Sequence, residues 1–322
     1  MENKYSNKYV IETGIGLQDV DHLKNSSYFI NESERYIKGE ITLSELEQIV
    51  ASYYKSKPDV EERSEEADII AVRIAQIISE DTFTFTVGQL LAIHKRLFEG
   101  IYGHAGKLRD YNFSKREWVL DGASVMYGDY RELSNTLEYD FAMEKRFDYL
   151  NLSMDEIIDH LSIFISNLWQ IHAFEEGNTR TTAVFFIKYL RSLGFEATND
   201  VFAKNAWYFR NALVRANYKH LRKGIVENRT FLVKFLRNLL LNENNPLNNK
   251  ELHINDVSIT TNETKEVRIL KILKENPYIK SDDLALQLNV SVRTIKSIMS
   301  TLEKDGLIER VNGKRFGYWR VL

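Results

Sequence analysis

Nine residues near the middle of the chain place four kinds of reactive group side by side. The stretch reads HAFEEGNTR and offers an imidazole (His172), a carboxylate (Glu176), a Gly177-Asn178 turn and a guanidinium (Arg180). Helical patterns run into this stretch and out of it, so the turn lies at a helix N-terminus. Free backbone N–H groups and the positive end of the helix dipole favour an anion there. The combination predicts a site for a metal-bound phosphate chain with a base beside it.

The side chains of this stretch fit distinct roles in such a site. His172 is the strongest candidate for a general base, because an unperturbed pKa of about 6.5 suits proton abstraction at neutral pH. Glu176 would act through Mg²⁺, since an unshielded carboxylate and phosphates repel each other. Arg180 opposes the helix dipole, which makes it more informative as a ligand of the same anion. Each residue alone is also typical of an ordinary helix end or turn, but the four together are hard to explain as a solvated loop.

Two helices must hold this stretch in place. The first, SMDEIIDHLSIFISNLWQI, begins with the capping-box pattern Ser153-x-x-Glu156 and carries a buried apolar stripe. The second, TTAVFFIKYLRSLGF, is apolar on nearly every side, so we expect it to be central. Upstream, residues 61–80 and the segment VGQLLAIHKRLFEG also read as helices. After them, YNFSKREWVL followed by Asp121-Gly122 predicts a short strand that turns into a β-hairpin.

The nine-residue stretch resembles the signature of the Fic family, His-x-Phe-x-(Asp/Glu)-Gly-Asn-Gly-Arg-x-x-Arg. The helical surround and the upstream hairpin fit as well, and the resemblance covers about residues 60–240. It implies a mainly α fold, a Fic-type helical bundle with a short β-hairpin flap. It also implies nucleotidyl transfer, usually of AMP from ATP to a protein hydroxyl. The matching residues are His172, Phe174, Glu176, Gly177, Asn178 and Arg180.

The resemblance implies how each residue would act. His172 would deprotonate a Ser, Thr or Tyr hydroxyl of a target protein, and that hydroxyl would attack the α-phosphorus of ATP. Glu176 would hold Mg²⁺ on the α and β phosphates. The backbone of Gly177–Thr179 would cradle phosphate oxygens, and Arg180 would stabilise the developing charge.

Two further regions follow from the resemblance. The hairpin near 111–127 would be a flap that aligns a target segment by strand pairing. The adenine pocket would lie near WYFRNALVRAN (207–217), with Asn217 as the candidate ligand. We therefore expect ATP and Mg²⁺ as cofactors and a protein with an acceptor hydroxyl as partner, and a homodimer stays open.

Three positions depart from the signature. Ala173 replaces the usual Pro, and Thr179 replaces a Gly, so its side chain would lie close to the phosphates. Ala183 stands where the family has a second Arg, which contacts the γ-phosphate and pairs with an inhibitory Glu. No Ser or Thr upstream of the predicted hairpin has Glu four residues later. We hypothesise that this form of autoinhibition is absent, or that Glu65, Glu66 or Asp68 is used differently.

The same residues leave two other functions open. A related fold can transfer a phosphate or a different nucleotidyl group by reorienting the donor. Thr179 and Ala183 lie where that orientation would be set. A transcriptional regulator could instead use the domain to sense a nucleotide without chemistry. His172 and Glu176 argue against the sensor, because a sensor needs no base.

Residues 264–322 read as a separate module. Three helical segments are followed by two β-rich runs around an Asn-Gly pair, a strong hairpin signal. The pattern resembles a winged helix-turn-helix, with Arg293 and Lys296 facing a DNA groove and Lys314 and Arg315 at the wing tip against phosphates. The module carries 12 Lys+Arg against 7 Asp+Glu, or +5, which leaves −8 for the rest of a chain of net charge −3. A protein-binding or dimerising module is the alternative to DNA binding.

Length and composition limit the domain organisation, the cysteine chemistry and the location of the protein. The 322 residues divide into a weakly organised N-terminal helical extension (1–60), a Fic-like catalytic domain (61–242), a linker (243–263) and the winged helix (264–322). The absence of Cys excludes disulfides and Cys-ligated zinc. There is no apolar N-terminal signal region and no run of 18 apolar residues, so we expect a cytoplasmic protein that does not enter membranes.

Overall fold

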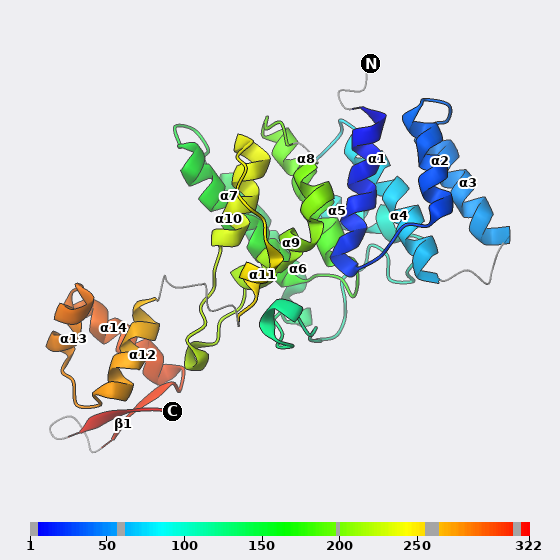
Figure 1. The fold of residues 1–322 in the computed structure, drawn as a ribbon. Coiled ribbons are helices and arrows are strands. Elements are labelled where there is room, and N and C mark those ends of the chain that lie inside the picture. The colour runs from blue at the N-terminus through cyan, green and yellow to red at the C-terminus, as the bar shows by residue number, and fades with distance from the viewer. Residues whose placement is uncertain (1–5, 57–61, 198–199, 255–263, 312–316) are drawn as a thin grey trace. The chain divides into compact units, whose positions relative to one another are not determined.

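The chain folds into two compact units. The computed structural model describes residues 6–56, 62–197, 200–254, 264–311 and 317–322. The larger unit contains Met1–Asn217 and Arg229–His253, and the smaller unit contains Tyr218–Asn228 and Ile254–Leu322. Figure 1 shows helices throughout the larger unit, and three helices with a small sheet in the smaller one. The mainly α fold predicted from the sequence is confirmed.

The larger unit is a helical bundle built around α8. Residues Asn178–Leu190 of this helix are all buried, as its apolar sequence predicted, and it packs against α4, α5 and α7. No helix among the described residues combines the length and the apolar character needed to cross a membrane. The elements of this unit are α1 (Asn7–Gly16), η1 (Leu17–Asp21), α2 (Ser27–Ile37), α3 (Leu43–Ser56), α4 (Glu62–Ser79), α5 (Val87–Phe98), η2 (Trp118–Leu120), η3 (Tyr130–Glu132), α6 (Leu133–Arg146), α7 (Met154–Ile171), α8 (Asn178–Ser192), α9 (Asp200–Ala216), α10 (Thr230–Leu241) and α11 (Asn249–Leu252).

The connection between α7 and α8 is short and well defined at both ends. α7 begins with the predicted capping box, in which the side chains of Ser153 and Glu156 each accept a bond from the other residue's backbone N–H. It ends at His172, whose φ of 51° lies in the left-handed region. Gly177, with a φ of 75°, precedes α8. The nine-residue stretch therefore spans the turn between two buried helices, as predicted.

Residues 6–56 are an integral part of the larger unit. α1 packs against α4 and α9, and two glycines bring the helix backbones together. A Cβ on Gly14 would lie 2.1 Å from the carbonyl oxygen of Ala71, and one on Gly16 would lie 2.1 Å from that of Ala203. Glycine permits such close backbone approach. These contacts correct the expectation of a weakly organised extension.

The segment 111–128, which we call the flap, reverses direction where the sequence predicted, but as a helical turn rather than as a strand pair. Its residues form no strand, and Trp118–Leu120 make the single turn η2. Val119 and Leu120 are both buried, whereas a strand would direct two neighbours to opposite faces. Two backbone bonds join the arms at Glu117: its N–H donates to the carbonyl of Ala123 (2.9 Å), and its carbonyl accepts from the N–H of Gly122 (3.0 Å).

The smaller unit has its own apolar core, to which all its helices contribute. The predicted order of three helices and a hairpin is confirmed, and the strands pair antiparallel from Ile308 opposite Val321. The Asn312-Gly313 turn lies outside the described residues. The elements are η4 (Leu221–Lys223), α12 (Lys265–Glu275), α13 (Ser281–Leu288), α14 (Val292–Lys304), β1 (Ile308–Val311) and β2 (Tyr318–Val321).

The two units differ from the predicted domain ranges in two places. Residues 218–228 lie inside the predicted catalytic range but group with the winged helix, because Leu221 and Val226 pack in its core. α11 lies in the predicted linker but packs against α9, and its Leu252 is fully buried. The last part of that linker, residues 255–263, lies outside the described residues.

Candidate active site

His172 lies in an aromatic pocket at the end of α7. Its ring stacks on Tyr127 of the flap, with 3.8 Å between ring centroids, and meets Trp169 and Phe113 at steep angles. The side chain is buried, yet neither ring nitrogen has a hydrogen-bond partner among the described residues. Buried polar atoms are almost always paired, so an unpaired imidazole here points to a role in binding or catalysis.

The surroundings keep the ring of His172 neutral. Burial lowers its pKa well below the usual value of 6.5, and the positive charges of Lys115, Arg210 and Arg109 lower it further. A neutral imidazole has a free lone pair, which is the form that a general base needs. Negative charge bound nearby would raise this pKa, so a polyanionic donor would strengthen the base.

Glu176 extends from the turn toward the flap. Its Oε2 lies 2.9 Å from Nζ of Lys115, and 49% of its side chain is exposed. Among the described residues no group of three or more His, Cys, Asp or Glu side chains could hold a metal ion. A single accessible carboxylate fits Mg²⁺ that arrives on phosphates, because Mg²⁺ commonly combines one or two carboxylates with phosphate oxygens and water. The residues present therefore fit a metal bound together with a nucleotide.

The Gly-Asn turn is held by the side chain of Asn178 and by the ring of Phe98 from α5. The Asn178 side chain accepts a bond from the N–H of Phe174 (2.9 Å) and donates one to its carbonyl (2.7 Å). A Cβ on Gly177 would lie 2.2 Å from the ring of Phe98, so any other residue would require that ring to move. The side chain of Asn178 thus braces the turn. An anion would be bound by the backbone N–H groups at the start of α8.

Arg180 lies in the core of the unit and is surrounded by acids. Its guanidinium is 2.7 Å from Oε1 of Glu66 and 3.0 Å from Oδ2 of Asp21, and it donates a further bond to Gln18 (3.2 Å). A buried guanidinium requires such partners. An anion could reach it only by displacing these carboxylates. Arg180 is thus paired with the acid Glu66 within the protein, and its role at the phosphates stays a prediction.

Two segments of the chain match models of known protein families. Residues 84–190 match the model of the Fic/DOC family, and this segment contains the whole of the α7–α8 turn. The chain carries a Fic domain. Residues 263–309 match the model of winged helix-turn-helix DNA-binding domains, as the three-helix pattern predicted.

Two solved Fic structures are similar to this chain. One is the N-terminal Fic domain of a Bartonella effector protein from Bartonella sp. AR 15-3, with 19% identity, a TM-score of 0.43, and coverage of 57% of this chain and 85% of that one. The other is a Fic family protein from Desulfovibrio desulfuricans G20, with 15% identity, a TM-score of 0.44, and coverage of 98% and 87%. A search of curated proteins found no match.

Two further predicted residues of the Fic domain are engaged within the protein. The hydroxyl of Thr179 accepts a bond from the indole of Trp169 (3.0 Å) and is buried, so it is directed inward. The amide of Asn217 donates to the carbonyls of Ser166 (3.0 Å) and Leu213 (2.9 Å). Asn217 would have to exchange these bonds to contact an adenine, and its role there stays a prediction.

Arg109 connects the flap to the end of α7, and no feature of the sequence pointed to it. Its guanidinium donates to the carbonyls of His172 (2.7 Å), Tyr111 (2.6 Å) and Gly128. It thereby joins both ends of the flap to the residue that follows α7. Because most of its partners are backbone carbonyls, no pattern of side chains could have revealed it.

His94 of α5 supports the turn from the opposite side. Its ring stacks on Phe174 at 3.7 Å, accepts a bond at Nδ1 from the N–H of Gly106 (2.8 Å), and lies 3.1 Å from the carbonyl of Glu176 at Nε2. The first bond leaves the proton on Nε2, which donates to Glu176. Burial lowers the pKa of His94 to about 4, so the ring stays neutral and keeps both bonds.

A buried ion pair fixes the flap to α9. Arg210 donates to both carboxylate oxygens of Glu117 at 2.6 and 3.0 Å, and the hydroxyl of Tyr127 donates to the same carboxylate at 3.3 Å. Tyr127 is the residue that stacks on His172. The pair therefore holds the aromatic cover of the base in position.

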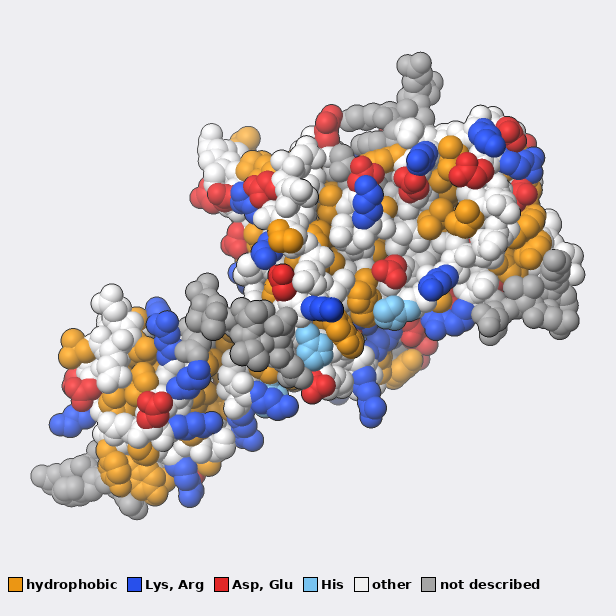
Figure 2. Space-filling model, viewed as in Figure 1, with side chains coloured by type: hydrophobic (Ala, Val, Ile, Leu, Met, Phe, Trp, Pro, Cys, Tyr) orange, Lys and Arg blue, Asp and Glu red, His pale blue; other side chains and the backbone are white. Residues whose placement is uncertain are grey.

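The winged helix exposes the predicted DNA-contacting residues that the structure describes. Arg293 and Lys296 are both exposed on α14, three residues apart and thus on one face. In Figure 2, Lys and Arg side chains gather on the visible face of this unit. Lys314 and Arg315 lie outside the described residues.

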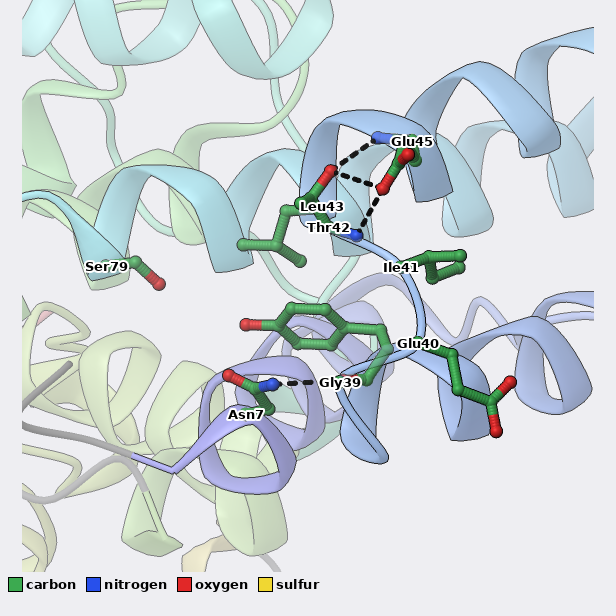
Figure 3. Close-up of a pocket in the computed structure, with 9 residues that line it drawn as sticks. Asn7, Gly39, Glu40, Ile41, Thr42, Leu43, Glu45 and Ser79 are labelled. Atoms are coloured by element: carbon green, nitrogen blue, oxygen red, sulfur yellow. Dashed lines mark hydrogen bonds between the residues drawn. The ribbon is translucent and has the colours of Figure 1, made fainter. Parts of the chain in front are cut away.

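A surface hollow of about 410 Å³ lies elsewhere in the larger unit. Figure 3 shows it between Asn7, the turn that joins α2 to α3, and Ser79 at the end of α4. Among its lining residues, Thr42 and Glu45 satisfy each other in the capping box of α3, and the Asn7 amide donates to the carbonyl of Tyr36 (3.0 Å). None of the signature residues lines this hollow.

Proposed function

We propose that the Fic domain is a protein adenylyltransferase that transfers AMP from ATP to a Ser, Thr or Tyr hydroxyl of a target protein. The Fic fold commonly transfers nucleotidyl groups, which supports this reaction. The observation that carries the proposal is the buried, neutral and unpartnered ring of His172. It lies beside a helix N-terminus that favours phosphate and four residues before the accessible carboxylate of Glu176.

The reaction follows from this arrangement. A ring nitrogen of His172 takes the proton of the acceptor hydroxyl, whose oxygen forms a bond to the α-phosphorus of ATP. The bond from the α-phosphorus to the oxygen that bridges to the β-phosphate breaks, and pyrophosphate leaves. The backbone at Gly177 and Asn178 binds phosphate oxygens, and Glu176 would hold Mg²⁺, which neutralises their charge when bound.

Labelled ATP tests the proposal on the full chain. Purified protein, alone and with a cell extract as a source of targets, is incubated with Mg²⁺ and ATP labelled at either the α or the γ phosphate. We expect α label on protein, a matching gain of one AMP in intact mass, and no labelling by His172→Ala. Label from γ only would show phosphoryl transfer instead. An unlabelled wild-type protein that still binds ATP would support a nucleotide sensor.

We also propose that the winged helix binds DNA through α14. The family match and the paired exposure of Arg293 and Lys296 favour this function. Each phosphate contact adds about one unit to the slope of log affinity against log salt. We propose that Arg293 and Lys296 neutralise phosphate charge from within the groove. In an electrophoretic shift at several salt concentrations, the double variant Arg293→Ala/Lys296→Ala should therefore make that slope less steep by about two. Lys274→Ala, which removes an exposed charge from α12, is the control. An unchanged slope in the double variant would exclude α14 as the contact.

A further inference from the structure

The Fic site needs positive charge that its signature does not provide in this chain. Charge on a transferred phosphoryl or nucleotidyl group is normally stabilised by cations and oriented donors. Position 183 is Ala, and Arg180 is buried against Glu66 and Asp21. Neither signature position therefore presents a free cation to a triphosphate at the turn.

Three cations lower the pKa of His172, and two of them are already bound to other groups of the protein. Arg109 donates to backbone carbonyls around the flap. Arg210 forms a two-pronged pair with the buried carboxylate of Glu117. Both are needed where they are, because releasing either would leave a buried polar group unpaired.

Lys115 differs from these two in its exposure and its partner. Its side chain is 28% exposed, and its ammonium pairs with Glu176, itself 49% exposed. An ion pair this exposed contributes about 0–1 kcal/mol, so it exchanges readily for another partner. The backbone N–H of Lys115 donates to Oγ of Ser124 (3.2 Å), which fixes the base of the side chain within the flap.

We propose that Lys115 is the phosphate-binding cation of this site, supplying from the flap the charge that position 183 lacks. Without a nucleotide it neutralises Glu176. When the donor binds, the ammonium moves to the phosphate oxygens and leaves the Glu176 carboxylate to the metal. A lysine suits this exchange, because its ammonium carries three donors on a flexible stem. The inference rests on the proposed nucleotidyl transfer.

Binding measurements separate phosphate recognition from folding. Affinities of the full chain for adenosine and, with Mg²⁺, for an ATP analogue with a methylene group between the α and β phosphates are measured by calorimetry. Lys115→Met keeps the apolar stem and removes the charge. It should weaken binding of the analogue about ten- to one-hundred-fold, as expected for a charge-assisted bond, and leave adenosine binding unchanged. Lys115→Arg should restore most of the loss, and Arg116→Met, the loss of an exposed neighbouring charge, should have no effect.

The outcomes distinguish this inference from the proposed function. Equal weakening of adenosine and analogue by Lys115→Met, or analogue binding equal to wild type, would overturn the role of Lys115. If wild-type protein transfers α label while Lys115→Met binds the analogue normally, the transferase stands and the inference fails. If the wild type transfers no α label, the proposed function itself fails, whatever the binding data show.

Discussion

Replacing Gly177 by Ala tests how the turn of the active site is held. The left-handed φ of 75° would cost an Ala about 1 kcal/mol. The new Cβ would also lie 2.2 and 2.3 Å from two atoms of the Phe98 ring, so that ring must move. Such overpacking costs about 1–3 kcal/mol, which gives a total loss of about 2–4 kcal/mol in the free energy of unfolding.

Gly194→Ala is the matched control. Its φ of 89° is also left-handed, but a Cβ there meets no atom within 4 Å, so it should lose only about 1 kcal/mol. Urea unfolding is followed by tryptophan fluorescence in a Trp319→Phe background, which confines the signal to the larger unit. Equal losses for the two glycine variants would refute the clash. Adding Phe98→Leu should recover part of the loss in Gly177→Ala, and additive effects would contradict the contact.

Three further predictions concern the same site. The pKa of His172 is lowered and its neutral ring is the active form, so kcat/KM for transfer should stay constant as pH falls to 6.5 and decline only below it; a decline that begins above pH 6.5 would contradict this environment. Glu66→Gln removes one of the two carboxylates that pair with Arg180 among the described residues and should lower the free energy of unfolding by about 3 kcal/mol in urea titrations, whereas an unchanged midpoint would show that the pair is not buried in solution. Asn178→Ala removes two buried bonds to the turn and should cost about 2 kcal/mol together with most of the transfer activity; full activity would show that the turn does not need this brace.

The turn between α7 and α8 could be predicted because its information is local. A capping box, an apolar period and a Gly-Asn pair all lie within about thirty residues and specify helix, turn and helix. The same is true of the winged helix, where each segment has its own start and stop signals. These are the elements in which propensity, pattern and turn chemistry agree.

The surroundings of Arg180 could not be predicted, because they depend on long-range contacts. Gln18 and Glu66 lie 162 and 114 positions away in the sequence, and no local pattern relates them to the signature. The η2 turn of the flap could not be predicted for another reason. Its residue types favour a strand, but the adjacent residues Val119 and Leu120 are both buried in the core, which a strand would not allow.

The smaller unit is built from two separate segments of the chain, residues 218–228 and residues 254–322. The chain leaves the larger unit after Asn217, returns at Arg229 and leaves again after His253. A Fic domain truncated at residue 253 would retain Leu221 and Val226 without the apolar core in which they pack. Exposed residues of this kind promote aggregation. A cut at the apparent linker therefore does not separate the two units cleanly, and point variants in each unit are the better test of the two proposed functions.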